Sequence, residues 1–167
     1  MHALTEWRDF YVMIGTASGA MIGAAFIVAT LTANLEKRGL GLRGFITPSA
    51  VHLGSVLVGS AILTVPTLNG LSLAILLGAG GVGGAGYSII VATRIWHLEL
   101  DLDDRWFYVA LPIMAYATMA TAAIMACTRN EPTFETLAVA LVSLLVIGMR
   151  NIWDMASFAI MQGRGEG

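Results

Sequence analysis

Five apolar stretches, each long enough to cross a bilayer as a helix, occupy most of this sequence. A membrane span needs about 20 apolar residues to cross roughly 30 Å of hydrocarbon. Five segments meet that requirement: Phe10–Leu35, Ser49–Leu68, Leu71–Ile95, Trp106–Cys127 and Phe134–Trp153. Each must be helical, because lipid offers no partner to backbone N–H and C=O groups. The sequence therefore predicts an all-α, polytopic integral membrane bundle of five transmembrane helices, which forms one domain over residues 1–167.

The charge content supports a membrane location. Charged residues make up 12% of the 167 residues and hydrophobic residues 57%, whereas a soluble domain carries about 25% charged residues. The net charge of −2 gives no indication of nucleic-acid binding. A single cysteine, Cys127, cannot form an intrachain disulfide and leaves the redox compartment undetermined. The N-terminal segment lacks the features of a cleaved signal peptide, so we expect the first span to stay in the membrane.

Lysine and arginine predict the orientation. Five spans place the termini on opposite sides, and Arg8 and Arg129 fall on the N-terminal side. The other side carries seven basic residues: Lys37, Arg38, Arg43, Arg94, Arg105, Arg150 and Arg164. Basic residues concentrate on the cytoplasmic side, so we expect the N-terminus outside and the C-terminus in the cytoplasm. A four-span alternative, with a re-entrant hairpin in place of the second and third spans, removes this charge bias.

Glycines at four-residue spacing mark the first and third spans. Gly15, Gly19 and Gly23 form a stripe in the first span, and Gly80 and Gly84 form a similar pair in the third. Membrane helices associate through close packing of small residues. The stripes predict helix-packing surfaces, either between helices of one chain or between protomers of a homo-oligomer. The sequence leaves both alternatives open.

Polar residues inside the spans are candidates for function, because burying them in lipid is costly. His52 and Ser55 share one face of the second span, and Asn34 lies at the inner end of the first. The plainer interpretation is a histidine that donates a hydrogen bond to a neighbouring backbone carbonyl near the cytoplasmic end. The alternative is a polar path, with these side chains lining a water-filled route toward the cytoplasmic side.

A second polar group, Arg150, Asn151 and Asp154, lies at the end of the fifth span. With Trp153 at the membrane interface, Arg150 lies about one turn inside and can extend its side chain outward. The plain interpretation is an interfacial ion pair that fixes the helix end. The functional alternative is a cytoplasmic gate or partner contact, which makes all three residues candidates for the polar path.

Four carboxylates gather in the loop between the third and fourth spans. They are Glu99, Asp101, Asp103 and Asp104. Hard cations need several oxygen ligands at short range, but this run lacks the turn glycine and closing glutamate of a calcium loop. A solvated loop is the favoured interpretation, and a weak metal site is the alternative.

Two segments carry a family resemblance. The stretch from Phe10 to Gly23 and the run Arg150-Asn-Ile-Trp-Asp resemble a group of small uncharacterised bacterial membrane proteins. The resemblance covers the first and last spans only. It implies a protein of the bacterial cytoplasmic membrane and carries no activity over to this chain.

These features predict a class of function. We expect a homo-oligomeric membrane protein of the channel or transport type, with its polar groups toward the cytoplasmic side. The alternative is a non-catalytic membrane subunit that binds or regulates a larger membrane complex. No arrangement of catalytic residues is present in the sequence, so we expect neither an enzyme nor a cofactor.

Overall fold

The structure is a computed structural model, which describes residues 2–37, 43–95, 105–128 and 132–164, without the side chains of 2–5, 33–37, 43–45 and 162–164. The described residues form α1 (His2–Lys37), α2 (Arg43–Thr64), α3 (Gly70–Ile95), the π-helical turn η1 (Trp106–Ala110), α5 (Leu111–Thr128) and α6 (Thr133–Arg164). Five of these helices are long and apolar enough to cross a membrane. The prediction of an all-helical protein with five such helices is confirmed.

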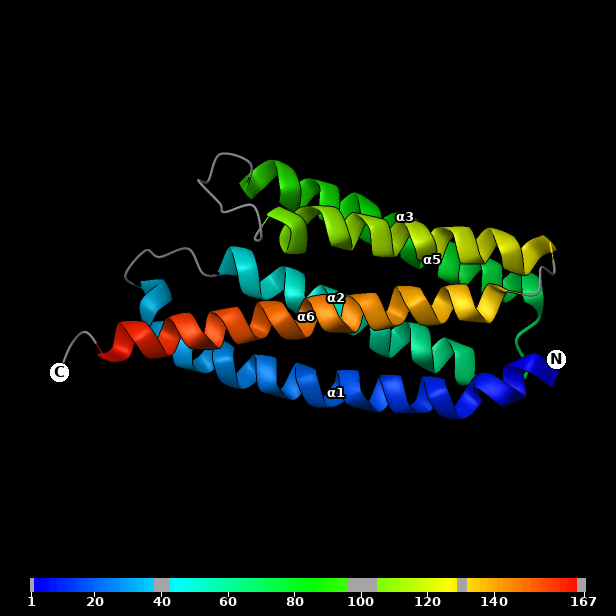
Figure 1. The fold of residues 1–167 in the computed structure, drawn as a ribbon, viewed down its shortest axis with the longest axis horizontal. Coiled ribbons are helices and arrows are strands. Elements are labelled where there is room, and N and C mark those ends of the chain that lie inside the picture. Colours follow the sequence, from blue (N-terminus) through cyan, green and yellow to red (C-terminus); the bar gives the residue numbers. More distant parts are fainter. Residues whose placement is uncertain (1, 38–42, 96–104, 129–131, 165–167) are drawn as a thin grey trace.

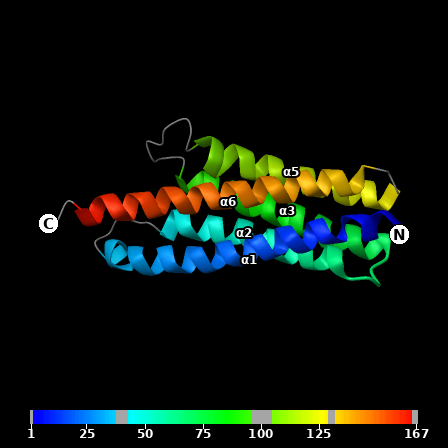
Figure 2. The ribbon, with the colours of Figure 1, turned by 60° about the horizontal axis from the view of Figure 1, so that its bottom comes forward.

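The five long helices run along a common axis and place the two termini at opposite ends of the bundle (Figures 1 and 2). α1 packs against α2, and α3 packs against α5. α6 lies between these two pairs and contacts α1, α2 and α5 (Figure 1). The last helix of the chain therefore holds the bundle together.

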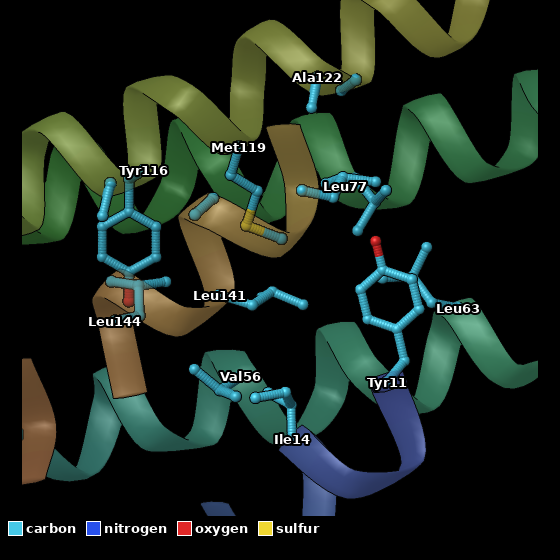
Figure 3. Close-up of a cluster of buried hydrophobic side chains, with 14 of the residues drawn as sticks. Tyr11, Ile14, Val56, Leu63, Leu77, Tyr116, Met119, Ala122, Leu141 and Leu144 are labelled. Atoms are coloured by element: carbon cyan, nitrogen blue, oxygen red, sulfur yellow. The ribbon is translucent and has the colours of Figure 1, made fainter. Parts of the chain in front are cut away.

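The main core contains side chains from all five long helices. Figure 3 shows Tyr11 and Ile14 of α1, Val56 and Leu63 of α2, Leu77 of α3, Tyr116, Met119 and Ala122 of α5, and Leu141 and Leu144 of α6. In lipid these side chains gain little by leaving an apolar solvent, so close packing rather than water exclusion stabilises the core.

Glycines allow α3 to approach α5 closely. A Cβ atom on Gly81 would lie 2.7 Å from the backbone N of Ala120, and a Cβ on Gly84 would overlap the ring of Tyr116. A Cβ on Gly80 would meet the Cε atom of Met119 at 3.2 Å. The Gly80 and Gly84 pair thus faces α5 within the same chain, and Gly84 in particular leaves room for the Tyr116 ring.

The glycine stripe of α1 does not stay on one contact surface. A Cβ on Gly15 would lie 3.0 Å from the Cβ of Ser60 on α2, but nothing lies within 4 Å of the corresponding positions at Gly19 and Gly23. Each step of four residues turns a helix by about 40° beyond a full rotation. Two steps carry Gly23 about 80° away from Gly15, so only the first glycine of the stripe meets α2.

Two helices begin differently from their predicted spans. α2 starts at Arg43, which places Pro48 inside the helix rather than at its start. α5 is preceded by η1, in which the Leu111 N–H bonds to the carbonyl of Trp106, five residues earlier. Pro112 follows directly and has no N–H to donate. The local departure from α-helix therefore lies in the turn before the proline.

The connections at the other ends are short. Between α2 and α3, the Asn69 side-chain oxygen accepts a hydrogen bond of 2.8 Å from the Ser72 N–H. This contact caps the first turn of α3. The last helix continues beyond the predicted boundary at Trp153 and reaches Arg164. Arg150, Asn151 and Asp154 therefore lie within a continuous helix rather than at its end.

Candidate functional site

A chain of hydrogen bonds links α2 to α5 in the interior of the bundle. The Nδ1 atom of His52 lies 3.1 Å from the hydroxyl oxygen of Tyr116, and this hydroxyl lies 2.9 Å from Oγ of Ser55. His52 is 2% exposed and Tyr116 is fully buried. Three polar side chains from two helices thus satisfy one another where lipid and apolar side chains offer no other partner.

The hydrogen bonds among His52, Tyr116 and Ser55 all run in one direction. The Ser55 hydroxyl donates its only hydrogen to the backbone carbonyl of Val51, at 2.9 Å. The Tyr116 hydroxyl must then donate to Ser55, and Nδ1–H of His52 must donate to Tyr116. Neutral His52 therefore carries its proton on Nδ1, and its Nε2 atom is left as a hydrogen-bond acceptor. The chain runs from His52 through Tyr116 and Ser55 to a backbone carbonyl.

The neighbouring helices hold these side chains in place. The Tyr116 ring lies against Gly84 of α3, the position at which any side chain would overlap it, and it points away from α5 toward the side of the core occupied by Leu144 (Figure 3). On the opposite side of α2, the Ser18 hydroxyl donates a 2.6 Å hydrogen bond to the Leu53 carbonyl. α2 is therefore tied to α1 beside His52 and to α5 through it.

The second polar group occupies the same end of the bundle on α6. Arg150 forms an ion pair with Asp154, with 3.1 Å between Nη1 and Oδ2. The Arg150 guanidinium also lies over the ring of Phe107 in η1, 3.9 Å from the ring centroid. Such a contact combines cation–π attraction with stacking. The π-helical turn is thereby linked to α6.

Asn151, between these two charged residues, has no such partner. Its side chain is fully buried, and neither Oδ1 nor Nδ2 makes a hydrogen bond to any residue that the structure describes. Leaving an amide without a partner in apolar surroundings costs roughly 2–7 kcal/mol. Among the sequence-predicted residues, Asn151 is thus the one whose polar atoms the described fold does not satisfy.

The two polar groups face the same junction between helices. One turn before Asn151, a Cβ on Gly148 would lie 2.8 Å from Cγ of Leu53 and 3.5 Å from the carbonyl oxygen of Ser49. His52 lies between Ser49 and Leu53 and is therefore at about the level of Gly148. Asn151 lies about 5 Å farther toward the C-terminal end, which is one helical turn.

The length of α6 relates these residues to the bilayer. Its 32 residues extend about 48 Å, more than the roughly 30 Å of a hydrocarbon core. A hydrocarbon layer that begins at Thr133 ends near Trp153, a side chain that is 72% exposed, as an interfacial tryptophan would be. In that frame Asn151 lies just inside the boundary, and the chain from His52 to Ser55 continues toward the middle of the membrane.

The other half of the bundle interior is mostly apolar. Its core contains Leu63, Leu77 and Leu137, each no more than 1% exposed. Ser60 is also buried in this half, and its hydroxyl makes no hydrogen bond to any residue that the structure describes. The Tyr11 hydroxyl lies in this half and donates to the carbonyl of Phe134 at 2.7 Å. The hydrogen-bond chain therefore stops at half-buried Ser55, which borders a pocket between α2 and α3, and the core beyond it consists mostly of hydrocarbon side chains.

Several predicted candidates can now be located. The structure brings His52 and Ser55 together through Tyr116 and pairs Arg150 with Asp154. The side chain of Asn34 and all of Glu99, Asp101, Asp103 and Asp104 lie outside the described residues. Within the described part of the chain, no three histidine, cysteine, aspartate or glutamate side chains form a group that could hold a metal ion.

Sequence reasoning missed three participants: Tyr116, Ser18 and Phe107. Each contacts a residue of another helix. Ser18 lies 35 positions from its hydrogen-bond partner Leu53, and Tyr116 lies 64 positions from its partner His52. One signal was available for Tyr116, because a tyrosine in the middle of an apolar span needs a partner for its hydroxyl.

The chain matches no protein-family model, no curated protein and no solved structure.

Proposed function

We propose that this chain is a transport-type protein of the bacterial cytoplasmic membrane, in which protons pass through the inner half of each bundle. The hydrogen-bond chain of His52, Tyr116 and Ser55 carries this proposal. All three side chains can both donate and accept a hydrogen bond, which is what passing a proton along a chain requires. The proposal gives the protein no catalytic role.

The position of the chain supports an inner half-path. The excess of basic residues at the C-terminal end of the bundle favours a cytoplasmic location for that end. Asn151 and the Arg150–Asp154 pair then lie near the cytoplasmic boundary, His52 lies about a turn deeper, and Ser55 lies about a turn beyond that. Polar groups thus follow one another from the inner surface toward the middle of the membrane.

The mostly apolar half closes the path in this conformation. Hydrophobic constrictions act as gates because water does not fill them. Passage across the whole membrane therefore requires a rearrangement of the core around Leu63 and Leu137. We propose the described structure as the closed state.

Proton flux into proteoliposomes tests the proposal. Purified protein is reconstituted with a pH-sensitive dye inside, and a pH gradient and a potassium diffusion potential are applied. We expect flux above that of empty liposomes and a decrease of about tenfold in Tyr116→Phe, equivalent to about 1.4 kcal/mol. This variant removes the hydroxyl that joins His52 to Ser55 and keeps the ring against Gly84.

Tyr11→Phe is the matched control. It also removes a buried tyrosine hydroxyl with a hydrogen bond, but in the apolar half and away from the chain. Its flux should equal that of the unsubstituted protein. Equal losses in both variants, or no flux under any gradient, contradict the proposal.

One observation favours the second candidate, a non-catalytic subunit of a larger membrane complex. Gly19 and Gly23 are exposed on α1, and no atom of the described residues lies within 4 Å of a Cβ placed on either. Glycines on a lipid-facing helix allow another helix to approach closely. If liposomes show no flux, a partner helix on this face becomes the better account of the protein.

A further inference from the structure

We infer that Asn151 binds water entering from the C-terminal end of the bundle, and that this water passes protons to and from His52. The binding of water rests on the burial and the unpartnered amide of Asn151. The passage of protons rests on the proposed function. Neither the chain of His52, Tyr116 and Ser55 nor the Arg150–Asp154 pair assigns any role to the Asn151 side chain.

The Asn151 side-chain amide needs hydrogen-bond partners. Asn151 is fully buried, and both of its polar side-chain atoms are without a hydrogen bond among the described residues. Buried polar groups in proteins are almost always hydrogen-bonded, to protein or to ordered water. An amide offers two donors and a carbonyl oxygen, so a water molecule can satisfy it from either side.

Asn151 is close to the surface from which water would enter. It lies two residues, or about 3 Å along the axis, inside the boundary marked by Trp153, so water has only a short distance to travel. Arg150 and Asp154 flank it and pair with each other. The charged end of α6 is thus beside the route that water would take.

Asn151 and His52 face the same junction between helices. On α6, Gly148 meets Leu53 and Ser49 of α2, and Arg150 lies over Phe107 of η1. Around the axis of α6, Asn151 lies between the side that meets α2 and the side that meets η1. It therefore faces the junction of α2 with η1 and α5. His52 reaches into the same junction to meet Tyr116, about one turn away along the axis. One or two water molecules span this offset along the axis.

The charges beside Asn151 indicate what the site carries. The Arg150 and Asp154 side chains are joined by an ion pair and leave no net charge on that stretch of α6. A site without net charge attracts neither cations nor anions by its field. Because Nδ1 of neutral His52 carries the proton, its Nε2 atom can accept a hydrogen bond from water and receive a proton from it. Protons carried by water are therefore the substrate class that fits.

Cysteine accessibility tests the binding of water without requiring transport. The only native cysteine is removed by Cys127→Ser, and Asn151→Cys or Ile152→Cys is added. Inside-out vesicles are treated with a charged, membrane-impermeant methanethiosulfonate, which reacts with the thiolate in water. Ile152 is the matched control, because it is the next residue, is 6% exposed, and faces an apolar cluster with Ala25, Val28 and Leu53.

We expect Asn151→Cys to react at least about tenfold faster than Ile152→Cys. Equal rates for the two variants overturn the inference. A second measurement uses the unsubstituted protein, so that the size of the cysteine side chain cannot decide the result. Magnetisation transfer from water to the Asn151 side-chain amide, followed by solid-state NMR and assigned by its loss in Asn151→Leu, should be as fast as for surface amides. Slow transfer overturns the inference as well.

Flux separates the two parts of the inference. If Asn151→Cys is labelled and Asn151→Leu lowers proton flux about tenfold, both parts are supported. If labelling occurs but Asn151→Leu leaves flux unchanged, water binds there and the proton step is overturned. If Tyr116→Phe also leaves flux unchanged, the proposed function itself fails, and the labelling result still stands by its own measurement.

Discussion

Single residues on α3 divide into those that meet α5 and those that do not. Gly84 lies against the Tyr116 ring, whereas nothing lies within 4 Å of a Cβ placed on its neighbour Gly83. We predict that Gly84→Ala destabilises the protein by about 1–3 kcal/mol, because the methyl group displaces a buried ring. Gly83→Ala should leave stability unchanged or raise it by up to about 1 kcal/mol, since alanine favours the helix. Unfolding midpoints in detergent measure both, and equal midpoints contradict the prediction.

The same residues show where sequence reasoning reaches its limit. A four-residue glycine spacing indicates packing, but the partner of each glycine depends on neighbours that are distant in sequence. Tyr116 illustrates this, since its two hydrogen-bond partners lie 61 and 64 positions earlier. His52 and Ser55 were identified as candidates because polar side chains in an apolar span are conspicuous. The tyrosine that joins them was not, because its ring is equally suited to an apolar core.

At the scale of whole helices, the two ends of the α1 stripe should behave differently. Gly15→Leu places a large side chain against Ser60 of α2, so we predict a less stable fold. Gly19→Leu points into open space and should leave the fold intact. If α1 mediates contact between protomers, Gly19→Leu lowers the oligomer mass measured by mass photometry in mild detergent. An unchanged mass means that the outer part of the stripe is no interface.

Helix existence was predictable from the sequence and helix ends were less so. The five apolar stretches led directly to five helices, because lipid leaves the backbone no alternative. The boundaries depend on features without a hydropathy signal. α6 continues past Trp153 because its following residues suit a helix even outside the hydrocarbon. α2 begins before Pro48 because a proline near a helix start removes only one hydrogen bond.

The whole molecule has an orientation that its own cysteine can report. Cys127 is exposed at the end of α5, on the side of the N-terminus. With the N-terminus outside, a membrane-impermeant maleimide should label Cys127 in bacterial spheroplasts. Met161→Cys in a Cys127→Ser background, exposed at the opposite end of the bundle, should react only after permeabilisation. The reverse pattern places the N-terminus in the cytoplasm and moves the polar groups to the outer side.

In the proposed function, the bond from Ser55 to the Val51 carbonyl makes the closed state an insulator. A proton that reaches Ser55 from His52 finds a carbonyl oxygen of its own helix, which accepts a hydrogen bond but has no proton to pass on. Conduction therefore needs the serine to leave this rotamer and turn its hydroxyl toward the apolar half. Staggered rotamers of a small side chain interconvert quickly. In the proposed transport, the slow step is then the wetting of the core around Leu63 and Leu137, and Ser55 changes its rotamer after that step.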